Sequence, residues 1–400
     1  MSGLKQTRFG GPDDRADGPA ASCRVLVMGL GGGGCQSVAR MASAWATGPE
    51  VWLVNTDQQA LSACGMPERR LQVGRSLTRG VGTGGDPNLG RLAVEEDADL
   101  IREVLVGVEV LLLVVTFGGG TGTGAAPAIA RIAREAGVTT IGLVTLPFEF
   151  EGLRRRQLAA EGLEALRLQA DMVVTLPNQH LLGLADDQES LRDAFTRTDA
   201  MLNVAVRSLW RLLTQPGIIN LTLADLRNMV EHSSGACTFG YAEGSGSKKA
   251  EQALSRLMKS PLLDEGRLLG EAQALLVNIV GGPDLALAEV TRIMEQLTTR
   301  TRPDVRFFPG AAIEDDWKGR LAVIVLAAEG WDEAAVMPRS VAVPAEEPPG
   351  SEPVRPVQPE LPFSEEERGR FRGVDPTVVE GEDLDVPTYL RRGIKLSFER

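Results

Sequence analysis

The sequence predicts an α/β protein in which a Rossmann-like parallel-sheet domain is joined by a long central helix to a smaller α/β domain. Three observations predict this. Between residues 23 and 186, short runs rich in Val, Ile and Leu alternate with helical patterns. Residues 187–214 carry apolar side chains at helical spacing. Two further apolar runs, 274–282 and 320–330, flank a helical pattern at 285–297, which indicates a second layered region.

The first domain contains five apolar runs that we expect to be strands. They cover residues 24–30, 51–55, 108–117, 139–148 and 171–178. Their apolar residues are nearly continuous rather than alternating, which is typical of parallel strands that are buried on both faces.

The central helix is predicted from nine apolar residues that recur every three or four positions. They are Leu191, Ala194, Phe195, Leu202, Ala205, Val206, Leu209, Leu212 and Leu213. Pro216 and Gly217 follow directly and should end the helix. The spacing therefore predicts a long helix with one face buried.

The composition of the chain limits its location and its partners. With 54 acidic and 42 basic side chains, the formal net charge is −12, so we expect no nucleic-acid partner. The four cysteines have no Cys-x-x-Cys spacing, which argues against a zinc site or a disulfide framework. No apolar run approaches about 20 residues, and the N-terminus lacks a signal-peptide core. We therefore expect a cytoplasmic protein.

The composition also suggests where the ordered domains begin and end. We expect a disordered arm at 1–22, the parallel-sheet domain at 23–186, the central helix and its following loop at 187–225, and the smaller α/β domain at 226–330. A Pro- and Glu-rich segment at 331–380 should be a disordered linker. Residues 381–400 regain aromatic, aliphatic and basic side chains, as expected of a segment that becomes ordered on a partner.

Two glycine-rich loops, Gly29–Gly34 and Gly118–Gly124, each follow a predicted strand and open a predicted helix. Without a Cβ atom, glycine lets successive backbone N–H groups converge on an anion. The positive end of the helix dipole adds to the attraction. Both loops therefore indicate phosphate binding.

The first loop alone leaves three interpretations open. It satisfies Gly-x-Gly-x-x-Gly, with Asp57 after the next strand, as in a nicotinamide-dependent oxidoreductase. It also suits other phosphate sites, or a tight turn that binds nothing. The second loop, GGGTGTG, has no role in a dehydrogenase, and no Lys-Ser or Lys-Thr follows it as in a P-loop. Neutralisation of phosphate charge then depends on backbone amides, Thr121, Thr123 and a metal ion.

GGGTGTG resembles the signature of the tubulin and FtsZ family, and the resemblance extends along most of the expected ordered chain. Further matching segments, in order, are VMGLGGGGCQSVARM, VNTDQQAL, RGVGTGGDPNLGRLAVEED, TLPFEFEG, DAFTRTD, QPGIINLTLADLR and KSPLL. The resemblance implies a tubulin/FtsZ-like fold that binds GTP or GDP with Mg²⁺. It also implies head-to-tail filaments that form the cytokinetic ring, concentrate at the division site and hydrolyse GTP between subunits.

The resemblance also implies a set of GTP-binding residues, which bind the metal only through the nucleotide. The expected set is Gly31, Gly32, Gly33, Gly34, Cys35, Gln36, Asn55, Asp57, Gly82, Thr83, Gly84, Gly85, Gly118, Gly119, Gly120, Thr121, Gly122, Thr123, Gly124, Pro147, Glu151, Arg155, Phe195 and Asp199. Gln36 stands where the family usually has Asn.

Four of these side chains have assigned roles in the resemblance. Glu151 and Arg155 match the pair at the ribose, although a solvated i,i+4 ion pair is the alternative. Phe195 matches the residue that stacks on the base, and Asp199 matches the acid that pairs with guanine. A carboxylate accepts hydrogen bonds from guanine N1–H and N2–H₂ but would face the adenine N1 acceptor, so GTP should be preferred over ATP.

The loop after the central helix matches the segment that completes the active site of a neighbouring subunit. Asn220 and Asp225 match the family pattern, but Thr222 replaces the first of its two acidic residues. We expect GTP hydrolysis at a reduced rate, because one carboxylate that polarises water is lost. Two alternatives remain: another acid substitutes and turnover is ordinary, or the chain forms a structural or regulatory filament.

The end of the chain resembles the FtsZ C-terminal peptide, which implies docking of membrane tethers and division regulators. The residues expected to bind these partners are Asp385, Val386, Pro387, Tyr389, Leu390, Arg391 and Arg392. Membrane contact would then be mainly indirect. The alternative is an ordinary frayed terminus.

Overall fold

The computed structural model describes residues 23–179, 190–215, 217–232 and 236–328, together with residues 378–379 and 382–383. The chain divides into two units, Met1–Ala342 and Val343–Arg400. The described part of the second unit is an antiparallel pair of strands, β11 (Val378–Val379) and β12 (Glu382–Asp383). The expected arm at 1–22, most of the expected linker and the candidate partner-binding residues lie outside the described residues.

The first unit is built on one 10-stranded sheet in the order β3-β2-β1-β4-β5-β6-β7-β10-β8-β9. The strands are β1 (Val25–Leu30), β2 (Glu50–Asn55), β3 (Arg70–Gln72), β4 (Val110–Thr116), β5 (Thr139–Leu146), β6 (Met172–Pro177), β7 (Ala236–Ser245), β8 (Ala274–Gly281), β9 (Arg306–Ile313) and β10 (Arg320–Ala328). All neighbours from β3 to β7 are parallel. Strand β10 runs antiparallel to β7 and β8, while β8 and β9 are parallel.

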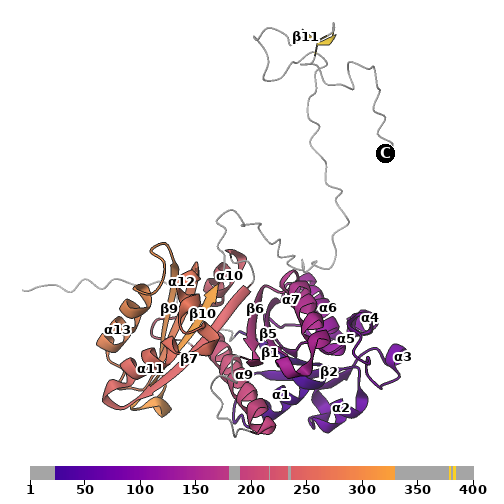
Figure 1. Cartoon of the computed structure of the whole chain (residues 1–400), viewed down its shortest axis with the longest axis horizontal. Helices are drawn as coiled ribbons and strands as arrows, with labels where there is room; N and C mark the ends of the chain where they lie inside the picture. Colours follow the sequence, from indigo (N-terminus) through magenta and orange to yellow (C-terminus); the bar gives the residue numbers. More distant parts are fainter. Residues whose placement is uncertain are drawn as a thin grey trace, which may run out of the picture. The chain divides into compact units, whose positions relative to one another are not determined.

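The sheet is covered by helices on both faces (Figure 1). The helices are α1 (Gly31–Ser43), α2 (Gln58–Ala63), α3 (Arg75–Thr78), α4 (Pro87–Glu96), α5 (Ala98–Val104), α6 (Thr121–Glu135), α7 (Leu153–Arg167), α9 (Leu191–Thr214), α10 (Leu223–His232), α11 (Lys249–Met258), α12 (Arg267–Glu271) and α13 (Leu287–Thr298). Helices α4 to α7 share one core with the β1 to β6 strands, and α11 to α13 share another with β7, β8 and β10.

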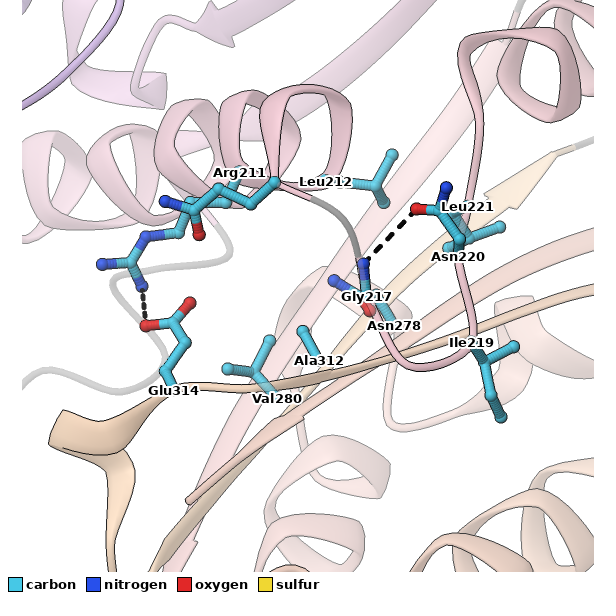
Figure 2. A pocket seen from close by; sticks show the side chains of 11 residues that line it. Arg211, Leu212, Gly217, Ile219, Asn220, Leu221, Asn278, Val280, Ala312 and Glu314 are labelled. Atoms are coloured by element: carbon cyan, nitrogen blue, oxygen red, sulfur yellow. Dashed lines mark hydrogen bonds and ion pairs between the residues drawn. The ribbon is translucent and has the colours of Figure 1, made fainter. Parts of the chain in front are cut away.

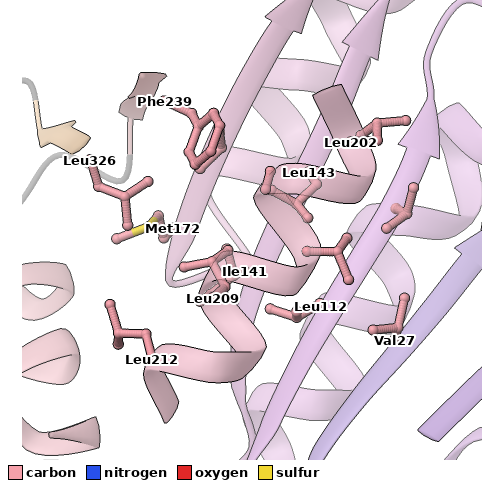
Figure 3. Close-up of a cluster of buried hydrophobic side chains, with 14 of the residues drawn as sticks. Val27, Leu112, Ile141, Leu143, Met172, Leu202, Leu209, Leu212, Phe239 and Leu326 are labelled. Carbon is pink, nitrogen blue, oxygen red and sulfur yellow. The ribbon is translucent and has the colours of Figure 1, made fainter. Parts of the chain in front are cut away.

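A third core joins the two halves of the sheet through α9 (Figure 3). Leu202 and Leu209 of α9 pack in this cluster and are at most 2% exposed. From the half of the sheet made by β1 to β6, the cluster contains Leu112 of β4. From the other half, it contains Leu326 of β10. Because α9 packs in a core shared by both halves of the sheet, its two ends are held in fixed positions.

The start and end of α9 agree with simple sequence rules. The Ser190 hydroxyl accepts a hydrogen bond from Asp193 N–H, which satisfies one of the free donors of the first turn. After the helix ends at Thr214, backbone hydrogen bonds between Ile219 and Ala311 join the following loop to β9. The loop that leaves α9 is therefore held against the sheet.

The predicted α/β fold class, with its mostly parallel sheet, is confirmed. Each of the seven apolar runs forms a strand, namely β1, β2, β4, β5, β6, β8 and β10, and the pattern at 285–297 forms α13. The sequence interpretation missed β3, β7 and β9. Strand β7 is interrupted by Gly240 and Gly244, and β9 contains Pro309, all of which weaken a strand pattern.

Candidate functional site

The two glycine loops lie at the carboxyl ends of adjacent parallel strands. Strand β1 ends at Leu30 and leads directly into α1, while β4 ends at Thr116 and leads through Gly118–Gly120 into α6. Strands β1 and β4 are direct neighbours in the sheet. The first turns of α1 and α6 therefore present their free backbone N–H groups at the same edge.

Close backbone contact explains why two of the glycines are required. Gly31 has a φ of +67°, and a Cβ there would lie 2.8 Å from the backbone nitrogen of Gly122. A Cβ on Gly120 would lie 2.6 Å from the backbone nitrogen of Asp86. By contrast, a Cβ on Gly32 or Gly119 would meet no atom within 4 Å. The loops thus pack on each other but leave open space where a phosphate could approach the backbone.

Three threonine hydroxyls connect the predicted phosphate loops beneath this surface. The hydroxyl oxygen of Thr121 lies 2.7 Å from that of Thr56 and 3.4 Å from that of Thr83. Thr123 has a different role, because its hydroxyl accepts a hydrogen bond from Gly118 N–H at 3.0 Å. We infer that Thr123 closes the second loop.

The third predicted loop has the backbone geometry that only glycine adopts easily. Gly82, Gly84 and Gly85 have φ angles of +82°, +60° and +85°. A Cβ on Gly84 or Gly85 would meet nothing within 4 Å. Asp86 then caps α4 by accepting a hydrogen bond from Asn88 N–H. The contact between the Thr83 and Thr121 hydroxyls thus places this open loop beside the start of α6.

Asn55 provides independent evidence for a ligand at this edge. It is buried, and its Oδ1 accepts a hydrogen bond from Thr56 N–H at 2.9 Å. Its Nδ2 is also buried but has no hydrogen-bond partner among the described residues. An unsatisfied buried donor costs about 1–3 kcal/mol, so a ligand acceptor would relieve it. The neighbouring Asp57 caps α2 through Ala60 N–H.

Two residues of the first loop differ in what they can offer to a ligand. The Cys35 thiol is fully buried and lies 3.2 Å from Gly29 O and 3.3 Å from Val54 O. Burial raises the pKa of this thiol, so it stays neutral and points into the protein. Only the backbone of Cys35 can face a nucleotide, whereas the Gln36 side chain is exposed.

The expected ribose pair is formed in the structure. Arg155 donates to Glu151 at 2.7 Å, and Glu151 also accepts a hydrogen bond from Phe148 N–H at 2.9 Å. Glu151 is mostly buried, while Arg155 is exposed. Pro147, which directly follows β5, is buried beside this turn. The ion pair fits both the nucleotide role and the simpler role as a local i,i+4 pair.

The expected base-binding residues lie one turn apart near the start of α9. The Phe195 ring makes an edge-to-face contact with Phe148 at 5.5 Å and is 40% exposed, so part of its surface is open to a base. Asp199 is mostly buried and accepts a hydrogen bond from Arg40 at 2.6 Å. The sequence interpretation missed Arg40, because its partner lies on a helix far along the chain.

The candidate catalytic loop lies at the other end of α9. Asn220 is exposed, and its Oδ1 accepts a long, 3.4 Å hydrogen bond from Gly217 N–H (Figure 2). Thr222 and Asp225 follow at the start of α10 and are hydrogen-bonded to each other. The 24 residues of α9 span about 36 Å at 1.5 Å per residue. One subunit therefore does not bring Asp225 to its own base-binding residues.

A small cavity lies beside this loop, between the end of α9 and strands β8 and β9 (Figure 2). Its volume is about 20 Å³, and Arg211 makes an ion pair with Glu314 across it at 2.8 Å. That volume holds about one water molecule. We therefore do not regard it as the nucleotide site.

The structure contains no ready-made metal site within the parts of the chain that it describes. There, no three or more His, Cys, Asp or Glu side chains come together in a group that could bind an ion. Over the same ranges, no helix is both long and apolar enough to cross a bilayer. The residues Asp385 to Arg392 lie outside the described residues, so their partner-binding role stays a prediction.

Comparison with known families matches both halves of the first unit. The tubulin/FtsZ family GTPase domain matches residues 24–186, and the FtsZ family C-terminal domain matches residues 235–330. The first match includes both glycine loops, which argues against the nicotinamide-dependent oxidoreductase considered from the first loop alone.

Individual relatives agree with the family match. The chain is 38% identical over 320 residues to the cell division protein FtsZ of Caulobacter vibrioides, which covers 80% of this chain and 62% of that protein. It is also 38% identical over 302 residues to cell division protein FtsZ 1 of Archaeoglobus fulgidus, covering 76% and 81%. The matched region thus spans less than two thirds of the Caulobacter protein but most of the archaeal one.

Solved structures show the same fold. An empty FtsZ dimer from M. jannaschii superposes with a TM-score of 0.70 and 32% identity, covering 77% of this chain and 88% of that chain. The predicted tubulin/FtsZ-like architecture is confirmed by this superposition.

Proposed function

The chain belongs to the FtsZ family of tubulin-like cell division GTPases, and on that basis we propose that it hydrolyses GTP between subunits of a head-to-tail filament. In this proposal, residues 23–186 bind the nucleotide, residues 187–225 form the central helix and catalytic loop, and residues 226–330 complete the subunit. The filament would serve the cytokinetic ring.

One observation carries the proposal: the nucleotide residues and the catalytic loop lie at opposite ends of α9. Phe195 and Asp199 lie near its start, while Asn220 and Asp225 lie beyond its end. A head-to-tail contact would place the loop of one subunit over the nucleotide of the next. Such a contact does not close on itself, so it produces filaments.

Hydrolysis in this arrangement depends on positioning and on charge. The first turns of α1 and α6 would hold the phosphates through backbone N–H groups, and the donor of Asn55 would gain an acceptor. Asn220 and Asp225 of the incoming subunit would orient and polarise the attacking water. Mg²⁺ would neutralise phosphate charge and be bound through the nucleotide rather than by protein side chains.

Guanine specificity would come from Asp199. Its carboxylate can accept hydrogen bonds from both guanine donors, and Phe195 offers an exposed ring for the base. The ion pair with Arg40 orients this carboxylate in the absence of nucleotide.

Recruitment to the division site would depend on the C-terminal peptide. We assign tether and regulator binding to Asp385, Val386, Pro387, Tyr389, Leu390, Arg391 and Arg392. The support is the resemblance of this sequence to the FtsZ C-terminal peptide and its mixture of apolar and basic side chains.

Sedimentation tests the central proposal most directly. Purified protein with Mg²⁺ is centrifuged after incubation with GTP, GDP or ATP, and bound nucleotide is identified separately. We expect polymer in the pellet with GTP and little with GDP or ATP. Equal sedimentation with all three nucleotides, or tightly bound NAD without guanine nucleotide, would contradict the proposal.

Thr222 supports a second candidate, a family member that acts mainly as a structural or regulatory filament. It occupies a position where the resemblance implies an acid. Light scattering recorded together with phosphate release distinguishes the two candidates. Assembly without turnover would favour the second, and assembly followed by phosphate release would favour the first.

A further inference from the structure

Thr222 and Asp225 form a reciprocal hydrogen-bonded unit at the start of α10. The Thr222 hydroxyl accepts from Asp225 N–H at 3.1 Å and donates to Asp225 Oδ2 at 2.7 Å. Thr222 N–H donates to the same Oδ2 at 2.8 Å. This is the arrangement of a capping box, with Thr222 as the N-cap and Asp225 at the third helical position.

The two oxygens of the Asp225 carboxylate are therefore not equivalent. Oδ2 accepts two hydrogen bonds from Thr222, whereas Oδ1 accepts none from the residues that the structure describes. Two donors on one oxygen fix the rotation of the carboxylate and leave Oδ1 to accept from another group. A carboxylate held in this way loses little entropy when it engages a water molecule.

The backbone on both sides of this unit is anchored. Before it, Ile219 and Ala311 exchange two backbone hydrogen bonds at 3.2 and 3.0 Å, and Leu221 is buried. After it, Leu226 is fully buried in the core that contains α9. Thr222 lies between these anchors, so the direction of its hydroxyl is set by the fold.

We propose that Thr222 is a positioning residue for the attack of water on GTP: its hydroxyl holds Oδ2 of Asp225 so that Oδ1 faces the nucleotide of the next subunit. This inference rests on the proposed function, because it requires Asp225 to act on the nucleotide of a neighbouring subunit. It differs from an interpretation in which Thr222 is only the absence of an acid. On that interpretation the hydroxyl contributes nothing to turnover.

Three variants of the full chain separate these possibilities. Thr222→Ala removes the hydroxyl, and Thr222→Ser retains it. Ser190→Ala is the matched control, because Ser190 forms the same kind of cap with Asp193 at the start of α9. Either alanine should weaken a helix start and lower the thermal midpoint to a similar extent. The measurements are the critical concentration for assembly, the thermal midpoint, and GTP turnover per assembled subunit at saturating GTP.

We expect Thr222→Ala to lower turnover per assembled subunit about tenfold, with Thr222→Ser and Ser190→Ala within about twofold of the unmodified chain. Unchanged turnover in Thr222→Ala would overturn the positioning role, as would an equal loss in Ser190→Ala. Absence of GTP turnover by the unmodified chain would remove the proposed function, and the positioning role with it. Failure of the proposed function is therefore seen in the unmodified chain, and failure of the positioning role alone is seen in the variants.

Discussion

The guanidinium of Arg40 on α1 lies 2.6 Å from the carboxylate of Asp199 on α9. Helix α1 also carries the first glycine loop at its start, and α9 leads into the candidate catalytic loop beyond its end. A second polar contact follows, in which the Trp45 indole donates to Asn203 Oδ1 at 2.7 Å. Helix α1, whose first turn is proposed to bind phosphate, and the central helix are therefore joined directly at the proposed base-binding position.

Replacing Arg40 tests whether this contact prepares Asp199 for guanine. We expect Arg40→Met to weaken GTP binding by about three- to tenfold, because Asp199 loses a charge-assisted hydrogen bond and becomes free to rotate. Calorimetric titration with GTP measures the effect. Arg91→Met is the control, since Arg91 makes an exposed i,i+4 pair with Glu95 elsewhere. Equal affinities for the two variants would argue against preparation of Asp199 by Arg40.

Replacing Asp199 tests the origin of guanine specificity. In Asp199→Asn, an NH₂ group faces a guanine donor, and we expect GTP affinity to fall by about 100-fold. Xanthine carries an acceptor where guanine has its amino group, so the variant should gain affinity for xanthosine triphosphate. Competition binding with GTP, ATP and xanthosine triphosphate measures both changes. A variant that still prefers GTP would assign base recognition to another residue.

The parts of the site that the sequence revealed are those encoded by neighbouring residues. Glycine spacing at Gly118–Gly124 marks a strand-to-helix turn, because only residues without a Cβ permit the observed close backbone contacts. Helical spacing also places Asp199 one turn after Phe195, although the resemblance alone implies their roles at the base. These features need no knowledge of the tertiary structure.

Other parts depend on packing between distant segments. Arg40 meets Asp199 only because α1 and α9 lie on the same face of the sheet. The unsatisfied nitrogen of Asn55 becomes visible only when its surroundings are known to be buried. The Thr222 and Asp225 unit is a different case, because Thr-x-x-Asp before an amphipathic helix is a local capping signal. The sequence contains that signal, whereas the family resemblance marks this position only by its missing acid.

Restoring an acid at Thr222 tests whether its absence limits the rate. Aspartate is also a good N-cap, so Thr222→Asp should retain the start of α10 while supplying a second carboxylate for the attacking water. The variant loses the hydroxyl that donates to Asp225 Oδ2, but the backbone N–H of residue 222 still donates to that oxygen. We expect the second carboxylate to outweigh the lost hydroxyl, so that GTP turnover per assembled subunit rises several-fold. Phosphate release, with assembly followed by sedimentation, provides the measurement. If turnover does not rise, Thr222 is not what limits the rate.

Removing the carboxylate of Asp225 tests hydrolysis between subunits. We expect Asp225→Ala to bind GTP and assemble, because Asp225 lies far from the proposed nucleotide-binding residues of its own subunit, but to release phosphate at least about 100-fold more slowly. Asp99→Ala is the control, since Asp99 is an exposed carboxylate that pairs with Arg102 away from α9 and α10.

A mixing experiment adds a sharper criterion. Asp199→Asn protein cannot bind GTP well but retains a normal catalytic loop, whereas Asp225→Ala binds GTP but lacks the loop carboxylate. If catalysis occurs between subunits, mixtures of the two should release phosphate faster than either alone, because some interfaces combine an intact nucleotide site with an intact loop. Turnover no greater than the sum of the separate proteins, in mixtures that demonstrably co-assemble, would place catalysis within a single subunit.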